Sequence, residues 1–217
     1  MSTVAPVIEY AKPEPKRLFG LDLRKLGKNV WALMDQVLIS GANFVTQVLV
    51  ARAMGDHQSE FGTFAVVIGV LLWCNMFQST LITQAHNVLG ATRVGQAYRR
   101  YTSSTAFEQI ILLAIQVALA LPMIFIAYAL GWSSAAMIVA LVPTIVTWQS
   151  MEFVRRVLYT EGRYRDAFLT DLIGYGGQRA LLGWMFYAAR HGGMQFTGAK
   201  AFYAMALSCG VAAVSIR

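Results

Sequence analysis

The sequence predicts an all-α integral membrane protein, built as a bundle of six transmembrane helices. Hydrophobic residues make up 57% of its 217 residues and charged residues only 13%, about half of the roughly 25% that is typical of soluble proteins. The apolar residues gather into six runs, of which the first five reach the roughly 20 residues that a membrane-spanning helix needs. These runs cover residues 30–54, 61–84, 105–130, 135–158, 167–189 and 201–216.

The first run is preceded by a polar leader, residues 1–29, which contains three prolines. The leader lacks the apolar core and cleavage site of a secretory signal, so we expect it to be retained. Leucines interleaved with arginines and lysines between residues 17 and 28 fit a short helix in the headgroup layer. A disordered basic leader fits the same composition.

The first run, residues 30–54, carries its polar residues on one face of a helix. Gln36, Ser40, Asn43 and Gln47 follow the spacing i, i+4, i+7, i+11, which places them in one stripe. Lipid offers no hydrogen bonds to these side chains, so we expect the stripe to face protein or a water-filled cavity. Two interpretations remain: the amides bond neighbouring helices, or they line a polar path.

The later runs also contain polar groups within apolar surroundings. The second and third runs contain Asn75 and Gln116, and prolines interrupt the third and fourth runs at Pro122 and Pro143. A proline within such a helix frees a carbonyl and permits a kink. Counted from the ends of the runs, the polar residues expected near mid-depth are Asn43, Asn75, Gln116, Thr144 and Arg179.

The fifth run, residues 167–189, carries an arginine about twelve residues from its start. Asp171, Tyr175 and Arg179 are spaced by four, which predicts that they share one helix face, and Gln178 lies beside them. An arginine at the bilayer centre costs roughly 2.5–3.5 kcal/mol on insertion scales. We therefore expect Arg179 to face a cavity, or to form a salt bridge with an acid on another helix.

The distribution of lysine and arginine predicts the orientation. The N-terminal segment carries six of these basic residues, and the polar link that we expect at residues 85–103 carries three. The 155–165 stretch carries four and the C-terminus carries one, so fourteen of the eighteen fall on one side. Only Arg52, Arg190 and Lys200 fall on the other side, and Arg179 lies within a run. The positive-inside rule then places the N-terminus in the cytoplasm.

The acidic residues of the runs lie close to the cytoplasmic ends on this topology. They are Asp35, Glu108, Glu152 and Asp171. Hydration, or pairing with Arg155 and Arg156, would satisfy them. Asp35 and Asp171 are the candidates for binding a coupling proton or ion, although Asp35 lies close to the inner end of its helix.

Several classes of function are not supported by the sequence. It contains no catalytic triad motif, phosphate loop or dinucleotide fingerprint, so we expect neither an enzyme nor a cofactor. Cys74 and Cys209 fall within apolar runs and are interpreted as buried free thiols. The histidines lie near the ends of different runs without the spacing of metal ligands, and the net charge of +7 follows the membrane topology, which argues against a nucleic-acid partner.

Two stretches resemble a known family of transporters. Residues 51–67, ARAMGDHQSEFGTFAVV, resemble the junction of the first two helices in bacterial polysaccharide flippases, with a small-residue helix end, a glycine and a Phe-Gly pair. Residues 151–173, MEFVRRVLYTEGRYRDAFLTDLI, resemble the basic inner loop between helices four and five of the same proteins. Both belong to the multidrug, oligosaccharidyl-lipid and polysaccharide exporter superfamily, and the resemblance extends over residues 30–216.

The resemblance implies one lobe of a two-lobed exporter. Members of the superfamily pack two bundles of about six helices around a central cavity, consistent with parallel repeats. This chain matches the N-terminal half only, and we expect a truncation at its C-terminus. A half-transporter that pairs with a second copy is the alternative to a fragment that lacks its C-terminal half.

The function implied by the resemblance is export of a lipid-linked oligosaccharide, on a polyprenyl pyrophosphate carrier, across the bacterial inner membrane during synthesis of surface polysaccharide such as lipopolysaccharide. Its expected partners are this lipid and the surrounding membrane lipids. The residues expected to line the substrate cavity are Arg179, Gln36, Ser40, Asn43, Gln47, Asn75, Gln116, Tyr175 and Gln178. The alternatives are a cation-coupled drug exporter, a membrane glycan polymerase or glycosyltransferase, and a non-transporting membrane scaffold.

Overall fold

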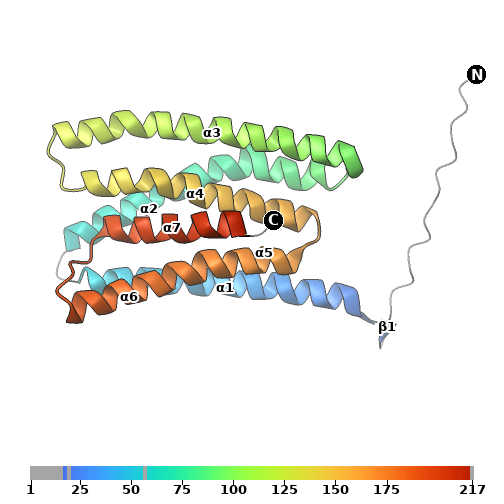
Figure 1. The fold of residues 1–217 in the computed structure, drawn as a ribbon, viewed down its shortest axis with the longest axis horizontal. Coiled ribbons are helices and arrows are strands. Elements are labelled where there is room, and N and C mark those ends of the chain that lie inside the picture. The colour runs from blue at the N-terminus through green and yellow to red at the C-terminus, as the bar shows by residue number, and fades with distance from the viewer. Residues whose placement is uncertain (1–16, 19–20, 56–57, 216–217) are drawn as a thin grey trace, which may run out of the picture.

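A computed structural model describes residues 17–18, 21–55 and 58–215 of the chain. Two short strands, β1 (Arg17–Leu18) and β2 (Leu21–Asp22), pair antiparallel ahead of the first helix. The rest of the described chain is helical, apart from short turns, as Figure 1 shows. Its helices are α1 (Leu23–Ala53), α2 (Gln58–Gln78), η1 (Ser79–Thr83), η2 (His86–Gly90), α3 (Gly95–Ala129), α4 (Ala135–Thr160), α5 (Tyr164–Asp171), η3 (Leu172–Gly176), α6 (Gly177–His191) and α7 (Gly198–Ser215).

The predicted class, an all-helical protein of membrane type, agrees with this structure. Five helices are long and apolar enough to cross a membrane: Val30–Ala53, Ser59–Gly90, Gly95–Ala129, Ala135–Thr160 and Gly198–Ser215. The fifth predicted run lies in the helical segment Tyr164–His191, formed by α5, η3 and α6. That segment is not among the five, and it holds a buried aspartate and an arginine.

The helices run alternately up and down along one axis, so the turns gather at two ends of the bundle (Figure 1). One end carries the η2–α3 and α4–α5 turns. We call it the basic end, because Arg93 and Arg163 lie in these turns and Arg99, Arg100 and Arg165 lie near the starts of the helices that follow. The other end, called the opposite end, carries the α1–α2, α3–α4 and α6–α7 turns.

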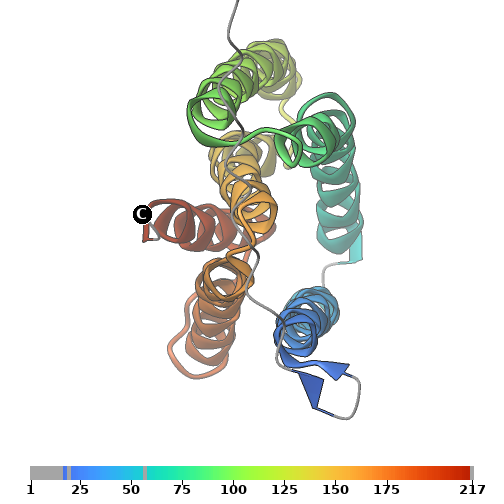
Figure 2. The ribbon, with the colours of Figure 1, turned by 90° about the vertical axis from the view of Figure 1, so that its right-hand side faces the viewer.

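The core of the bundle is formed around α4 and α7. Figure 2, a view along the helices, shows α4 at the centre with α7, α3, α2 and α5 around it. A Cβ at Gly210 of α7 would lie 3.3 Å from Thr147 Cγ2 of α4, so this glycine lets the two backbones approach closely. A hydroxyl reinforces the contact, since Thr144 Oγ1 lies 3.0 Å from the Phe202 carbonyl oxygen. The outermost helix, α3, exposes most of its apolar side chains.

The polar link expected at residues 85–103 is largely helical. The helix that begins with α2 continues through two π-helical segments, η1 and η2, to Gly90, and α3 already begins at Gly95. The polar residues that suggested a loop find partners on other helices. His86 Nε2 lies 3.2 Å from Thr102 Oγ1 of α3, and Thr160 Oγ1 of α4 lies 3.4 Å from Asn87 Oδ1. Side chains that pair between helices need no solvent, so the helices extend beyond the apolar runs.

Helix α1 also extends beyond its predicted start at residue 30, since it begins at Leu23. It lies at the edge of the bundle, beside α5 and α6 (Figure 2). Its buried face carries Asp35, Ala42, Thr46 and Val50. This face holds α1 against the segment Tyr164–His191 and leaves the other side of the helix uncovered.

Candidate functional site

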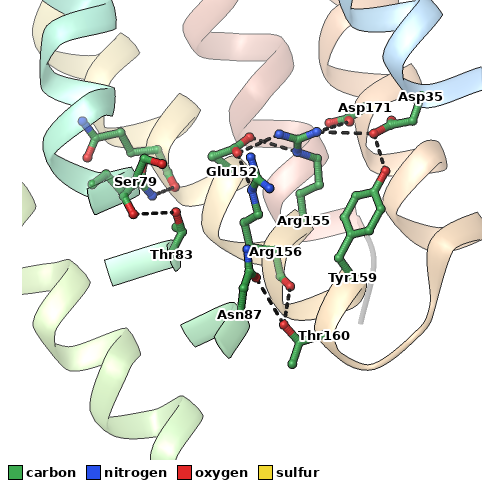
Figure 3. A network of polar contacts seen from close by, with 12 residues as sticks. Asp35, Ser79, Thr83, Asn87, Glu152, Arg155, Arg156, Tyr159, Thr160 and Asp171 are labelled. Atoms are coloured by element: carbon green, nitrogen blue, oxygen red, sulfur yellow. Dashed lines mark hydrogen bonds and ion pairs between the residues drawn. The ribbon is translucent and has the colours of Figure 1, made fainter. Parts of the chain in front are cut away.

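A cluster of buried charged side chains joins α1, α4 and α5 (Figure 3). At its centre, the Arg155 guanidinium of α4 places Nη1 3.3 Å from Asp35 Oδ2 of α1 and 3.3 Å from Asp171 Oδ2 of α5. Its Nη2 and Nε donate to the two carboxylate oxygens of Glu152, at 2.7 and 2.9 Å. One guanidinium therefore contacts three carboxylates from three helices. We call Asp35, Glu152, Arg155 and Asp171 the Arg155 cluster.

The Arg155 cluster is buried almost completely. Asp171 is 0% exposed, Asp35 3% and Glu152 6%. Buried charges persist only where they are paired and hydrogen-bonded. The planar fork of arginine, with five donors, suits several carboxylates at once better than a lysine ammonium would.

The four residues of the cluster carry three negative charges and one positive charge when they are ionised as usual. Arg156 supplies the second cation, with Nε 2.8 Å from Glu152 Oε1. Tyr159 donates its hydroxyl to Asp35 Oδ2 at 2.5 Å. Among the described residues, two cations thus face three carboxylates, and Oδ1 of Asp35 and Oδ1 of Asp171 are buried without a hydrogen-bond partner there. These oxygens are where an additional proton or cation would bind.

The sequence contained a signal for this cluster. Glu152, Arg155, Arg156 and Tyr159 follow the spacing i, i+3, i+4, i+7 on α4, which places them on one helix face. The expectation that Arg155 and Arg156 satisfy the acids near this end is confirmed for Asp35, Glu152 and Asp171. The fourth acid, Glu108, is exposed on α3.

A second polar network consists of glutamine amides between α2, α3 and α4. Gln149 Nε2 donates to Gln116 Oε1 at 2.8 Å, and Gln116 Nε2 donates to the Cys74 carbonyl at 3.2 Å. Gln78 donates to the Gln149 carbonyl at 2.7 Å, and Gln109 Nε2 lies 3.4 Å from Gln149 Oε1. The amide of Gln116, which was expected to line a cavity, is therefore occupied by neighbouring helices. Gln78, Gln109 and Gln149 are not among the site residues predicted from the sequence.

The predicted polar stripe of α1 lies on the uncovered side of that helix. Gln36, Ser40, Asn43 and Gln47 are all exposed. Each of the four lies one or two positions along the chain from a residue of the buried face of α1. The stripe therefore points away from the Arg155 cluster. None of the four forms a side-chain hydrogen bond with another described residue. Within the described chain, the stripe therefore does not bond neighbouring helices.

Arg179 bonds one backbone carbonyl of α1 and one of its own helical segment. Its Nε donates to the Ala42 carbonyl at 3.1 Å, its Nη1 donates to the Tyr175 carbonyl, and its Nη2 is buried without a partner among the described residues. No carboxylate pairs with it among the described residues, so the expected alternative of an interhelical salt bridge is not observed there. The Ala42 contact brings the guanidinium to α1 at the residue before Asn43.

The other residues expected to line a cavity are more enclosed. The hydroxyl of Tyr175 accepts a hydrogen bond from Trp148 Nε1 at 3.2 Å, and Tyr175 and Gln178 are buried. Asn75 is half-buried, and no described residue forms a hydrogen bond with its buried Oδ1. The π-helical segment η3 lies between Asp171 and Arg179, and its wider turn changes the phase of the helix. Asp171 and Tyr175 consequently contact α4, whereas Arg179 contacts α1.

The described cysteines and histidines form no metal centre. Cys74 and Cys209 are free thiols, and Cys209 is buried as predicted, whereas Cys74 is only half-buried. Among the described residues, no group of three or more histidine, cysteine or acidic side chains is placed to hold a metal ion.

No protein-family model, no curated protein and no solved structure matches this chain. The resemblance of residues 51–67 and 151–173 to polysaccharide flippases therefore stays a prediction.

Proposed function

We propose that this chain forms a six-span lobe of an exporter that moves a lipid-linked saccharide, carried on polyprenyl pyrophosphate, across the bacterial inner membrane. The observation that carries the proposal is the exposed polar stripe of α1, formed by Gln36, Ser40, Asn43 and Gln47. In this proposal the N-terminus and the basic end lie in the cytoplasm, and the chain has no enzymatic activity.

The stripe supports a polar path because of its length and its surroundings. It covers eleven residue steps, about 17 Å at 1.5 Å per residue, which is more than half of a hydrocarbon core of roughly 30 Å. Side-chain amides exposed to lipid lack hydrogen-bond partners, whereas water and sugar hydroxyls supply them. A saccharide crossing the membrane needs such a row of donors and acceptors.

Arg179 also supports the proposal, because the phosphates of the carrier lipid need a positive charge. Its guanidinium reaches α1 beside the stripe, and its Nη2 has no partner within the described chain. Guanidinium groups bind phosphate oxygens in a bidentate geometry. An unused, charged donor at this depth is costly unless a ligand or water satisfies it.

The segment Tyr164–His191 is the proposed sixth span. It is 28 residues long, about 42 Å at 1.5 Å per residue, so it is long enough to cross the membrane. It packs against α1, α4 and α7. Its buried polar residues include Asp171 and Tyr175, which contact α4. These contacts reduce the cost of a lower average hydropathy than that of the other five spans.

A cation-coupled drug exporter is the second candidate, and the Arg155 cluster is the observation that favours it. Three carboxylates face two guanidinium groups, and the unpartnered oxygens belong to Asp35 and Asp171 on two helices. Binding of a proton or a sodium ion there would balance the charge and change the contact between α1 and α5. The same coupling would also serve a saccharide exporter.

The experiment that tests the proposed function replaces Arg179 in the full chain. Arg179→Ala and Arg179→Lys are expressed in cells that depend on the chain for surface glycan, with Arg165→Ala, which changes an exposed arginine of α5, as the matched control. We expect Arg179→Ala to accumulate in the membrane but to abolish surface glycan, and Arg179→Lys to retain part of it. Normal export by Arg179→Ala would contradict a substrate contact, and failure to accumulate would indicate a structural role instead.

A further inference from the structure

We propose that the bundle binds one amine-bearing phospholipid of the phosphatidylethanolamine type at its opposite end. A hydrocarbon chain of this lipid lies in an apolar groove between α2, α3 and α4, and its ammonium group lies beside Glu60 in a polar cup. This site is separate from the α1 stripe and from the Arg155 cluster, and it does not depend on the transported substrate.

The groove is a cavity of about 450 Å³ with almost wholly apolar walls. Its walls include Val70 and Trp73 of α2, Leu112 and Leu119 of α3, and Ile138 and Leu141 of α4. The volume is in the range of small-molecule sites, which is roughly 300–1,000 Å³. Trp73 and Leu119 are exposed, so the groove opens toward the surface that faces lipid in a membrane.

The groove extends from the opposite end of the bundle toward the middle of the membrane. On α2 its lining runs from Thr63 to Phe77, fourteen residue steps or about 21 Å along the helix. Its deepest polar group is Gln116, whose amide is already bonded to Gln149 and to the Cys74 carbonyl. The groove therefore offers few free hydrogen-bonding groups along its length, which suits a hydrocarbon chain and not a polar ligand.

A polar cup continues the groove at the opposite end. It is a second cavity of about 320 Å³, lined by Ser59, Glu60, Thr63, Ser133, Ser134 and Met137. Thr63 and Ser134 line both cavities, so the two form one amphipathic site. Ser133 and Ser134 precede α4 and Glu60 lies in the first turn of α2, which places the cup at the level of lipid headgroups.

The chemistry of the cup identifies the headgroup. Glu60 Oε1 accepts a hydrogen bond from the Gly198 backbone amide at 3.0 Å, which fixes the position of the carboxylate. Among the described residues, the rest of the lining consists of three serines, a threonine and a methionine, without lysine or arginine. A primary ammonium supplies three donors for such a group of acceptors. The same carboxylate repels an anionic headgroup, which argues against pyrophosphate or phosphatidylglycerol as the occupant.

The test measures lipid binding to the purified full chain by native mass spectrometry. Phosphatidylethanolamine and phosphatidylglycerol with identical acyl chains are added in equal amounts. Glu60→Gln removes the charge but keeps an acceptor for Gly198, and Glu108→Gln changes an exposed acid of α3 as its control. Ala120→Phe and Val70→Phe fill the groove from α3 and from α2, and Ala118→Phe adds the same ring on an exposed position of α3.

The wild type should bind one phosphatidylethanolamine with a preference of about three- to fivefold over phosphatidylglycerol, as expected for a partly exposed charge pair. Glu60→Gln should remove the preference, and Glu108→Gln should keep it. Ala120→Phe and Val70→Phe should each lose the bound lipid, and Ala118→Phe should retain it. Equal binding of both lipids by the wild type, an unchanged preference in Glu60→Gln, or a lipid retained by whichever filled-groove variant folds would overturn the proposal.

Discussion

Arg155 shows how one side chain connects three helices within an apolar bundle. Its Nη1 lies at the same distance, 3.3 Å, from the carboxylates of α1 and α5, and its Nη2 and Nε bind Glu152 of its own helix. Removing the guanidinium would leave three buried carboxylates with Arg156 as their remaining cation among the described residues. The cost of breaking a buried charge pair is typically about 3–5 kcal/mol.

We therefore expect Arg155→Met to destabilise the protein by about 3–5 kcal/mol and to reduce its accumulation in membranes. Arg155→Lys should recover only part of the loss, because an ammonium does not reproduce the fork geometry. Thermal unfolding in detergent measures the effect, and Arg165→Met, at an exposed position of α5, is the control. Adding Asp35→Asn and Asp171→Asn to Arg155→Met should restore stability. A triple variant as unstable as Arg155→Met would show that charge is not the cause.

The excess carboxylate of the cluster leads to a separate prediction about coupling. Asp35→Asn removes one negative charge but leaves a side-chain oxygen to accept the Tyr159 hydroxyl. The protein should remain folded, while export should no longer respond to a proton or sodium gradient. Uptake or export assays with an imposed gradient measure this, with Glu108→Gln as the control at an exposed acid. A gradient response equal to that of the wild type would exclude Asp35 as the coupling residue.

Part of the Arg155 cluster, but not the glutamine network, was predictable from the sequence. The acids lie near one end of the predicted spans, which led to the expectation that hydration or Arg155 and Arg156 satisfy them, and the structure shows the pairing with arginine for three of them. The amide network around Gln149 was missed, because a single glutamine in an apolar run does not reveal which neighbour it bonds. Those partners depend on the rotation and depth of α2, α3 and α4, which periodicity alone does not define.

Among the helices, the contact of η3 with α4 and α7 depends on a glycine. A Cβ at Gly174 would overlap Sδ of Met151 on α4 and would lie 3.3 Å from its Cε and 3.5 Å from Ala212 Cβ of α7. Met151 is completely buried, so its side chain has little room to move. The glycine lets the segment that holds Asp171 approach α4 closely enough for the Arg155 contact.

Gly174→Ala should consequently destabilise the protein by about 1–3 kcal/mol through overpacking. Gly183→Ala is the matched control, because a Cβ there meets nothing within 4 Å, and it should be neutral or stabilising by about 0.5–1 kcal/mol. The free energies of unfolding of Gly174→Ala, Met151→Ala and the double variant form a cycle. The double variant should be more stable than the sum of the single effects predicts. Strict additivity would contradict the proposed contact.

The helix boundaries show what the apolar pattern does and does not predict. Runs of apolar residues located the five spans, but they ended the second helix at 84, whereas the helix continues to Gly90. His86 and Asn87 appear as loop residues in a hydropathy pattern, although they bond Thr102 and Thr160 in the structure. Polar pairing between helices is therefore the information that hydropathy lacks. Polar residues also lower the hydropathy of the segment Tyr164–His191, which is therefore not among the five spans.

The distribution of arginines over the two ends of the bundle predicts its orientation in the membrane. Its turns alternate between two ends (Figure 1), and arginines gather at the basic end. The positive-inside rule places that end in the cytoplasm. After replacement of Cys74 and Cys209, a cysteine at Ser133 should react with an impermeant thiol reagent in whole cells, and cysteines at Gln96 and Gly162 should react only after permeabilisation. Labelling of Gln96 in intact cells would reverse the orientation.

The uncovered polar face of α1 leads to the final prediction, which concerns assembly. Gln36, Ser40, Asn43 and Gln47 are exposed on the isolated chain, and amides that face lipid lose the hydrogen bonds that water would provide. A second helical surface is needed to enclose a hydrated path along this face. We therefore expect that the chain alone does not transport, and that it associates through α1 with a second copy or with another membrane protein.

Cysteine crosslinking in native membranes measures this association. In a background without Cys74 and Cys209, Asn43→Cys and Gln47→Cys should form a crosslinked species with a bifunctional thiol reagent, because they lie on the face that requires a partner. Phe125→Cys is the matched control, since Phe125 is also exposed but lies on the apolar surface of α3, and it should remain uncrosslinked. Asn43→Leu and Gln47→Leu together should weaken the association and abolish export while leaving the bundle folded, since neither side chain bonds another described residue. A purified monomer that moves a lipid-linked saccharide in vesicles would refute the prediction, because it would show that one bundle encloses the path by itself.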